Sequence, residues 1–257
     1  MPSNVITVLF LGDTVGKPGR EAAVRYLKQA SADFKIVNGE NLAGGIGITP
    51  SLAMEILEAG ADAITTGNHV WKKKEVIPYL MMEPRVVRPL NYPPGTPGFG
   101  YTLIARNGKS LYVANIEGRT FMGTLSCPFR AMEEFLEEKH LDVPAIVDFH
   151  AEATSEKVAM GWYLDGQVSA LVGTHTHVRT GDAHVLPGGT AYMTDVGMCG
   201  PRDSVIGVKK ELVIERFLTQ LPVRFEVADG NVWLEGVAIE LGADGHALSI
   251  TPFEEPA

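Results

Sequence analysis

The stretch V-I-T-V-L-F-L-G-D at residues 5–13 decides the fold class. Its apolar run predicts a buried strand that ends at a Gly-Asp turn, and the amphipathic stretch at 18–30 predicts a helix with proline in its first turn. The same unit then recurs, as strands at 34–39 and 61–67 and helices at 49–60 and 71–80. Strands and helices that alternate at this spacing indicate a parallel sheet built from right-handed crossovers.

The later part of the chain predicts antiparallel pairing beside further alternating elements. Two strand-like runs flank Asn107-Gly108, which is a strong hairpin signal. Downstream we expect helices at about 128–140 and 154–164 and strands at 144–150 and 168–175. Residues 223–253 alternate around Asp229-Gly230 and Asp244-Gly245, a pattern typical of an antiparallel meander. We therefore expect an α/β fold of two sheets packed face to face, with helices outside.

Length and composition limit the classes of protein that fit. The chain has 257 residues, 45% of them hydrophobic, which is enough for one large core, and we expect a single domain over 1–257. Its formal charge of -9 argues against binding long nucleic acid through phosphates. Cys127 and Cys199 form neither a disulfide framework nor a zinc-binding Cys pair. With no apolar run near the roughly 20 residues that cross a bilayer and no basic leader, we expect a cytoplasmic protein without a membrane partner.

Polar side chains follow five of the predicted strands. In an open parallel sheet, the carboxyl ends of the strands share one edge, where ligands bind. Each such residue alone is more typical of a turn, a helix cap or a satisfied loop pair. Together they make a poor core and a good metal site, because buried polar groups cost free energy unless they are paired or coordinated. The candidate ligands are Asp13, Glu40, Asn41, Asn68, His150, His175 and His177.

The number and type of these donors predict the metals. Seven donors exceed the four that one tetrahedral zinc takes, so we expect two metals that share a bridging carboxylate. Oxygen and nitrogen donors without thiolate favour iron, manganese or zinc.

Four motifs carry a resemblance to a known family. They are L-G-D-T-V-G-K-P-G-R at 11–20, N-G-E-N-x-A-G-G-x-G-I-T at 38–49, T-T-G-N-H-V-W at 65–71 and D-F-H-A-E-A-T-S-E-K at 148–157. With G-T-H-T-H at 173–177, the chain resembles the calcineurin-like metallophosphoesterases from residue 5 to about 200, and within them the bacterial YmdB-like cyclic-nucleotide phosphodiesterases. The resemblance implies a four-layer αββα sandwich of two mixed β-sheets flanked by helices.

The resemblance also implies a role for each candidate residue. One metal would be held by Asp13, Glu40, Asn41 and His177, and the other would share Glu40 and add Asn68, His150 and His175. His69, next to a ligand, would be the proton donor. The superfamily's usual Asp-x-His motif is Asp13-Thr14-Val15 here, and Asn41 would replace the missing histidine. The resemblance implies iron or manganese, with zinc as a further option.

The expected reaction is hydrolysis of a small phosphodiester, with 2′,3′-cyclic nucleotides favoured. A metal-bridging hydroxide would attack phosphorus while His69 protonates the departing alkoxide. The alternatives are a phosphomonoesterase or protein phosphatase with the same site, and a regulatory protein whose metals are structural. Loop residues Arg119, Arg179 and Arg202 are more typical of solvated charges than of phosphate ligands. A homo-oligomer is also expected, closed by apolar strand surface such as 232–234.

Overall fold

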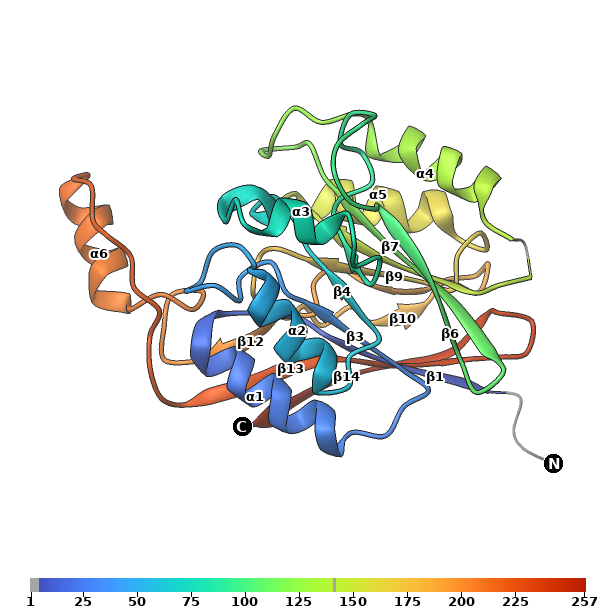
Figure 1. Cartoon of the computed structure of the whole chain (residues 1–257), viewed down its shortest axis with the longest axis horizontal. Helices are drawn as coiled ribbons and strands as arrows, with labels where there is room; N and C mark the ends of the chain where they lie inside the picture. The colour runs from blue at the N-terminus through green and yellow to red at the C-terminus, as the bar shows by residue number, and fades with distance from the viewer. Residues whose placement is uncertain (1–4, 141) are drawn as a thin grey trace.

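The computed structural model describes residues 5–140 and 142–257, which form two packed β-sheets with helices on their outer faces (Figure 1). The larger sheet has eight strands in the order β2-β12-β13-β1-β3-β4-β5, with β14 also paired to β13. β1, β3, β4 and β5 run parallel, whereas β13 is antiparallel to β1, β12 and β14. The bounds are β1 Ile6–Leu11, β2 Asp13–Thr14, β3 Phe34–Asn38, β4 Ala63–Thr65, β5 Val86–Val87, β12 Met198–Pro201, β13 Val232–Leu241 and β14 Ala247–Pro256.

The smaller sheet has six strands in the order β10-β11-β9-β8-β7-β6. Its inner strands are parallel and its two edge strands, β6 and β10, are antiparallel. The β6–β7 hairpin turns at Asn107-Gly108, where both residues have positive φ, as a two-residue type I′ turn requires. The bounds are β6 Tyr101–Arg106, β7 Lys109–Glu117, β8 Ala145–His150, β9 Ala170–Thr174, β10 His184–Val185 and β11 Ala191–Met193.

Three apolar clusters divide the molecule into four layers. Between the sheets, Phe10 and Ile36 of the larger sheet pack with Val113, Ile146 and Val172 of the smaller one. Two further clusters lie beneath the helices that cover the outer faces. The larger sheet is covered by α1 (Gly16–Gln29), α2 (Pro50–Glu58) and α3 (Val76–Leu80), and the smaller one by α4 (Pro128–Glu138) and α5 (Thr154–Leu164). The αββα sandwich of two mixed sheets is therefore confirmed.

The predicted helix at 71–80 is wrong in its extent. The structure has a single 3-10 turn, η1 (Val70–Lys72), and then the short helix α3. Pro78 explains the break, because proline lacks an amide proton and is tolerated only in the first turn of a helix. A helix that starts at Val76 satisfies this condition, and one that runs through from Trp71 does not.

The first hairpin of the predicted C-terminal meander is also wrong. Residues 222–231 form no strand, and Val227 makes one isolated bridge to Val208. β13 finds its partners in β1, β12 and β14 instead, so Asp229-Gly230 only leads into β13. The second hairpin, between β13 and β14 around Asp244-Gly245, is confirmed.

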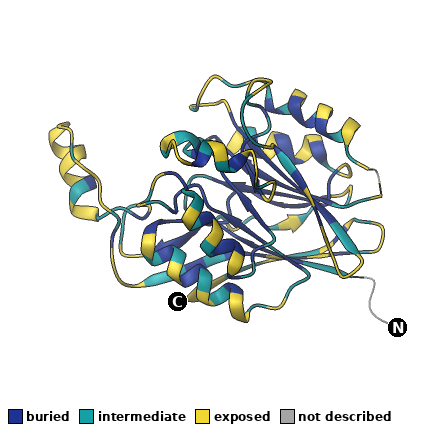
Figure 2. Cartoon of the chain, in the orientation of Figure 1, coloured by how far each residue is buried: buried dark blue, intermediate teal, exposed yellow. Residues whose placement is uncertain are grey.

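Helix α6 (Lys210–Thr219) was not predicted and extends away from the layers (Figure 1). Most of its surface is exposed (Figure 2), including the apolar side chains of Ile214, Phe217 and Leu218. By contrast, Leu234 of the apolar surface expected at an oligomer contact is buried in the core. The homo-oligomer stays a prediction. The exposed apolar surface of α6 is larger than that of residues 232–234. Among the described residues, no helix is both long and apolar enough to cross a membrane.

Candidate metal centre

Five strand ends deliver the candidate ligands to one place. Asp13 follows β1, Glu40 and Asn41 follow β3, Asn68 and His69 follow β4, His150 ends β8, and His175 and His177 follow β9. The structure brings all of these side chains together, as the strand-end pattern predicts. The carboxylates, Asn41 and His150 are buried and form the floor, whereas the other side chains are partly exposed.

The first group of donor atoms surrounds Nε2 of His150. This atom lies 3.1 Å from Oε1 of Glu40, 3.1 Å from Oδ1 of Asn68 and 3.1 Å from Nδ1 of His175. Gly67 makes this approach possible, because a Cβ there would collide with both Glu40 and the His150 ring. These four donors match the second predicted metal position.

The second group surrounds the amide of Asn41. Its Nδ2 lies 3.1 Å from Nε2 of His177, 3.4 Å from Oδ1 of Asp13 and 3.5 Å from Oε1 of Glu40. The His177 nitrogen and the Asp13 oxygen are 3.6 Å apart. Oε1 of Glu40 therefore belongs to both groups, which is the position a bridging carboxylate needs.

Each of the three histidines is oriented by a hydrogen bond at its other nitrogen. The Thr174 hydroxyl donates to Asp148 Oδ1 at 2.7 Å, so it accepts a hydrogen bond from His150 Nδ1 at 2.8 Å. His175 Nε2 lies 3.1 Å from Glu152 Oε2, and His177 Nδ1 donates to the Ile206 carbonyl at 3.0 Å. Such partners fix the tautomer and leave the inward-facing nitrogen free to bind a metal.

The donor set fits a bound cation. Three acceptors face His150 Nε2: the oxygens of Glu40 and Asn68 and the unprotonated nitrogen of His175. His150 Nε2 can donate one proton at most, so it cannot satisfy all three acceptors, whereas a cation can. Burial lowers the pKa of His150, but the Glu40 carboxylate outweighs it and raises that pKa to about 9. Burial lowers the pKa of His175 to about 4, so that imidazole is neutral at pH 7. Burial raises the pKa of Glu40, but His150 and His69 together hold it well below its usual range.

The loop between His175 and His177 is held in a strained conformation. Both histidines have positive φ, 102° and 62°, which non-glycine residues rarely adopt. The intervening Thr176 is anchored from below, since its amide and hydroxyl both donate to Oδ2 of Asp195, at 3.1 and 2.8 Å. Asp195 is itself paired with Lys157 at 2.8 Å, and both side chains are buried. This ion pair therefore supports the two candidate ligands from inside the protein.

His69 lies beside the donor atoms. Its amide donates to Glu40 Oε2 at 3.1 Å, and its Nδ1 lies 3.0 Å from Asn41 Oδ1 and 3.1 Å from Glu40 Oε1. Its Nε2 has no hydrogen-bond partner among residues 5–140 and 142–257. The imidazole is about a quarter exposed, so this nitrogen is accessible to a ligand at the mouth of the centre.

The sequence interpretation missed several charged groups at or beneath the centre. Glu117 ends β7, pairs with His150 across the strands and is 2% exposed, with one carboxylate oxygen unpartnered in the described part of the chain. Burial raises its pKa to about 7. The strand-end rule that identified the other residues also applies to Glu117. Glu152, Asp195 and Lys157 carried no comparable signal, because their roles depend on partners distant in the sequence.

Other residues considered from the sequence do not belong to the two groups of donor atoms. Arg202 is ion-paired with Glu254 at 2.6 Å, and Arg179 with the same carboxylate at 3.3 Å. Cys199 is buried, and burial raises its pKa to about 12, which excludes a reactive thiolate at neutral pH. Phe149 belongs to the core beneath α4 and α5.

Comparison with known proteins identifies relatives along almost the whole chain. A protein from Bacillus subtilis (strain 168) named 2′,3′-cyclic-nucleotide 2′-phosphodiesterase is 51% identical over 239 residues, which cover 91% of this chain and 90% of the relative. A crystal structure of a hypothetical protein from Thermus thermophilus matches with a TM-score of 0.93 at 44% identity, over 98% of this chain and 99% of the other. A structure described as a novel phosphatase from Mycoplasma pneumoniae matches with a TM-score of 0.93 at 35% identity, over 99% and 94%.

The family model of YmdB-like proteins matches residues 9–253. The matched region includes every candidate ligand from Asp13 to His177 and continues through β13 into the last strand, β14. With near-complete coverage by both the model and the relatives, the chain belongs to the family of YmdB-like proteins.

Proposed function

We propose that this chain is a metal-dependent phosphodiesterase that hydrolyses 2′,3′-cyclic nucleotides. The observation that carries the proposal is Glu40, whose Oε1 lies in two separate groups of oxygen and nitrogen donors. The name of the Bacillus subtilis relative supports the substrate class. The acidic composition favours a small substrate over long nucleic acid.

The donors divide into two metal positions. Asp13, Asn41 and His177 would hold one ion and Asn68, His150 and His175 the other, with Glu40 shared between them. A pair of such ions, iron or manganese by donor type with zinc as a further option, supplies an activated water and charge stabilisation for displacement at phosphorus. The chain's own residues then have to orient the substrate and deliver a proton to the leaving oxygen.

His69 is the proposed proton donor. Its Nδ1 faces two acceptor oxygens, Oδ1 of Asn41 at 3.0 Å and Oε1 of Glu40 at 3.1 Å, so one proton of the ring is on Nδ1. In the imidazolium form the ring carries a second proton on Nε2, which is the accessible nitrogen. A proton held there can pass to the oxygen that leaves phosphorus. The leaving group then departs as a neutral alcohol and not as a strongly basic alkoxide.

Replacing His69 with asparagine tests this role. We expect kcat for a cyclic nucleotide to fall by about a hundredfold or more, within the range that a positioned acid contributes. Metal content should stay at the wild-type value, because His69 is proposed to hold a proton and not a metal. The measurement is steady-state kinetics together with elemental analysis. The matched control is His184→Asn on the exposed strand β10, and loss of metal from the His69 variant would instead identify His69 as a ligand.

A comparison of ester classes separates the proposed activity from a phosphomonoesterase. Four carboxylates, of Asp13, Glu40, Glu117 and Glu152, lie at or beside the centre. A monoester carries a charge of about -1.5 to -2 at pH 7, whereas a diester carries a single negative charge. We expect kcat/KM to favour 2′,3′-cyclic AMP over p-nitrophenyl phosphate by at least about tenfold at matched metal content. Equal or reversed preference would support the monoesterase, and no hydrolysis of either by the fully loaded protein would support a structural metal site.

A further inference from the structure

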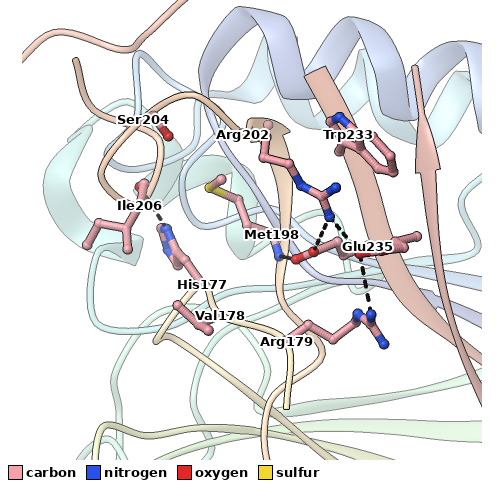
Figure 3. Close-up of a pocket in the computed structure, with 11 residues that line it drawn as sticks. His177, Val178, Arg179, Met198, Arg202, Ser204, Ile206, Trp233 and Glu235 are labelled. Atoms are coloured by element: carbon pink, nitrogen blue, oxygen red, sulfur yellow. Dashed lines mark hydrogen bonds and ion pairs between the residues drawn. The ribbon is translucent and has the colours of Figure 1, made fainter. Parts of the chain in front are cut away.

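A cavity of about 290 Å³ lies directly beside the candidate metal centre. His177 belongs to both places: its Nε2 faces Asn41 and Asp13, and its ring also lines the cavity. Figure 3 shows His177 and Ile206 on one side of this cavity and Arg202 and Trp233 on the other. Trp233 and Glu235 come from β13, beyond the end of β1 that leads to Asp13, so the cavity opens on the same edge of the sheet.

The lining of the cavity suits a flat, neutral organic group. The guanidinium of Arg202 lies over the Trp233 ring, with its Cζ 3.7 Å from the ring centre. Val178, Met198 and Ile206 supply apolar wall. Aromatic rings, with cation–π contributions from arginine, bind nucleobases in a way that tolerates different bases, because every base has a π face.

The charges in the cavity cancel. Arg179 and Arg202 are balanced by Glu235 and Glu254, with which they form ion pairs. A phosphate would therefore gain little there, and it is attracted to the metal positions instead. Nε of Arg179 is a buried donor with no hydrogen-bond partner within the described residues.

The chemistry of a 2′,3′-cyclic nucleotide requires one organic pocket and not two. Both ester oxygens belong to the same ribose, so the whole nucleoside lies on one side of the phosphorus. We propose that this cavity, defined by Arg179, Arg202, Trp233 and Glu235, holds the nucleoside of the substrate while its phosphate is at the metal positions. The inference rests on the proposed function, and it adds the residues that select a nucleotide over other cyclic diesters.

Replacing Trp233 with leucine tests the pocket. The two substrates are 2′,3′-cyclic AMP and ethylene phosphate, which has the same five-membered cyclic diester without a nucleoside. We expect the ratio of kcat/KM for the two to fall by about tenfold or more in Trp233→Leu, mainly through KM, and to recover largely in Trp233→Phe, which keeps a ring. The matched control is Trp162→Leu on the exposed face of α5, which leaves the ratio at the wild-type value. A ratio in Trp233→Leu equal to that of the wild type would overturn the proposal.

A binding measurement separates failure of the pocket from failure of the proposed activity. Adenosine is titrated into the metal-free protein while the indole N–H signals of the three tryptophans are followed by NMR. We expect one of these signals to move, and the same signal to be missing in Trp233→Leu. A shift with no hydrolysis of any diester would overturn the phosphodiesterase and retain a nucleoside site. Hydrolysis of the cyclic nucleotide with no shift of that signal would overturn the pocket alone.

Discussion

Replacing Glu40 with glutamine is expected to release metal from both positions and to lower diester hydrolysis by more than about a hundredfold. Substitutions of residues that only support metal ligands cost about 10- to 100-fold, and Glu40 is proposed to be a shared ligand. The change also removes the negative charge that holds the pKa of His150 at about 9. The measurement is metal per chain after dialysis, together with kcat/KM.

A companion variant and a control sharpen this result. His175→Ala removes a donor from one group and is expected to empty the position around His150 while metal remains beside Asp13. Anomalous scattering from crystals of both variants would locate the remaining ion and identify its element. Glu21→Gln on the surface of α1 makes the same chemical change away from the centre and should leave metal content unchanged. Full occupancy of both positions in the Glu40 variant would contradict the proposed bridge.

Replacing Lys157 with methionine is expected to destabilise the protein by about 3 to 5 kcal/mol, the usual cost of leaving one member of a buried ion pair without its partner. Within the described part of the chain, Asp195 would then be a buried carboxylate whose side chain accepts hydrogen bonds only from Thr176 and the amide of Gly197. The measurement is urea unfolding of the metal-free protein, which isolates this effect from metal binding.

The same variant should also weaken metal binding, because Asp195 anchors the strained loop that carries His175 and His177. Lys28→Met on the exposed side of α1 is the matched control and should unfold like the wild type. The double variant Lys157→Met/Asp195→Asn removes both charges and is expected to recover part of the lost stability. An unfolding curve for Lys157→Met that overlies the wild type would show that the pair contributes no stability.

The elements that were predictable carry their own periodicity. β1, β3 and α2 are each specified by a local pattern, and the Thr49 cap with Pro50 starts α2 where the sequence indicates. The candidate centre was predictable for the same reason, since strand ends were located correctly and each delivers its polar residue. The short strands β10, β11 and β12 were not, because they have two to four residues and exist only through pairing with neighbouring strands.

The interactions that support the candidate ligands were harder to predict from the sequence. Lys157 and Asp195 are 38 residues apart, and neither position shows from sequence that its charge is buried and paired. Glu117 was available to the strand-end rule but lies in a segment that was interpreted only as a hairpin. The cavity beside His177 combines β13 with the loop before α6, a region where the predicted hairpin was wrong.

The position of His175 above Asp13 also has a consequence for biosynthesis. The His175 amide donates to Oδ2 of Asp13 at 3.0 Å, although the two residues are 162 positions apart in the chain. Each half of the proposed centre takes ligands from both sheets, so neither half exists in a partly made chain. During translation, the nascent protein cannot capture a complete pair of ions until the ribosome has released residue 177 and the two sheets have docked. Metal loading is then a late event, and the ions chosen are those available to the folded protein.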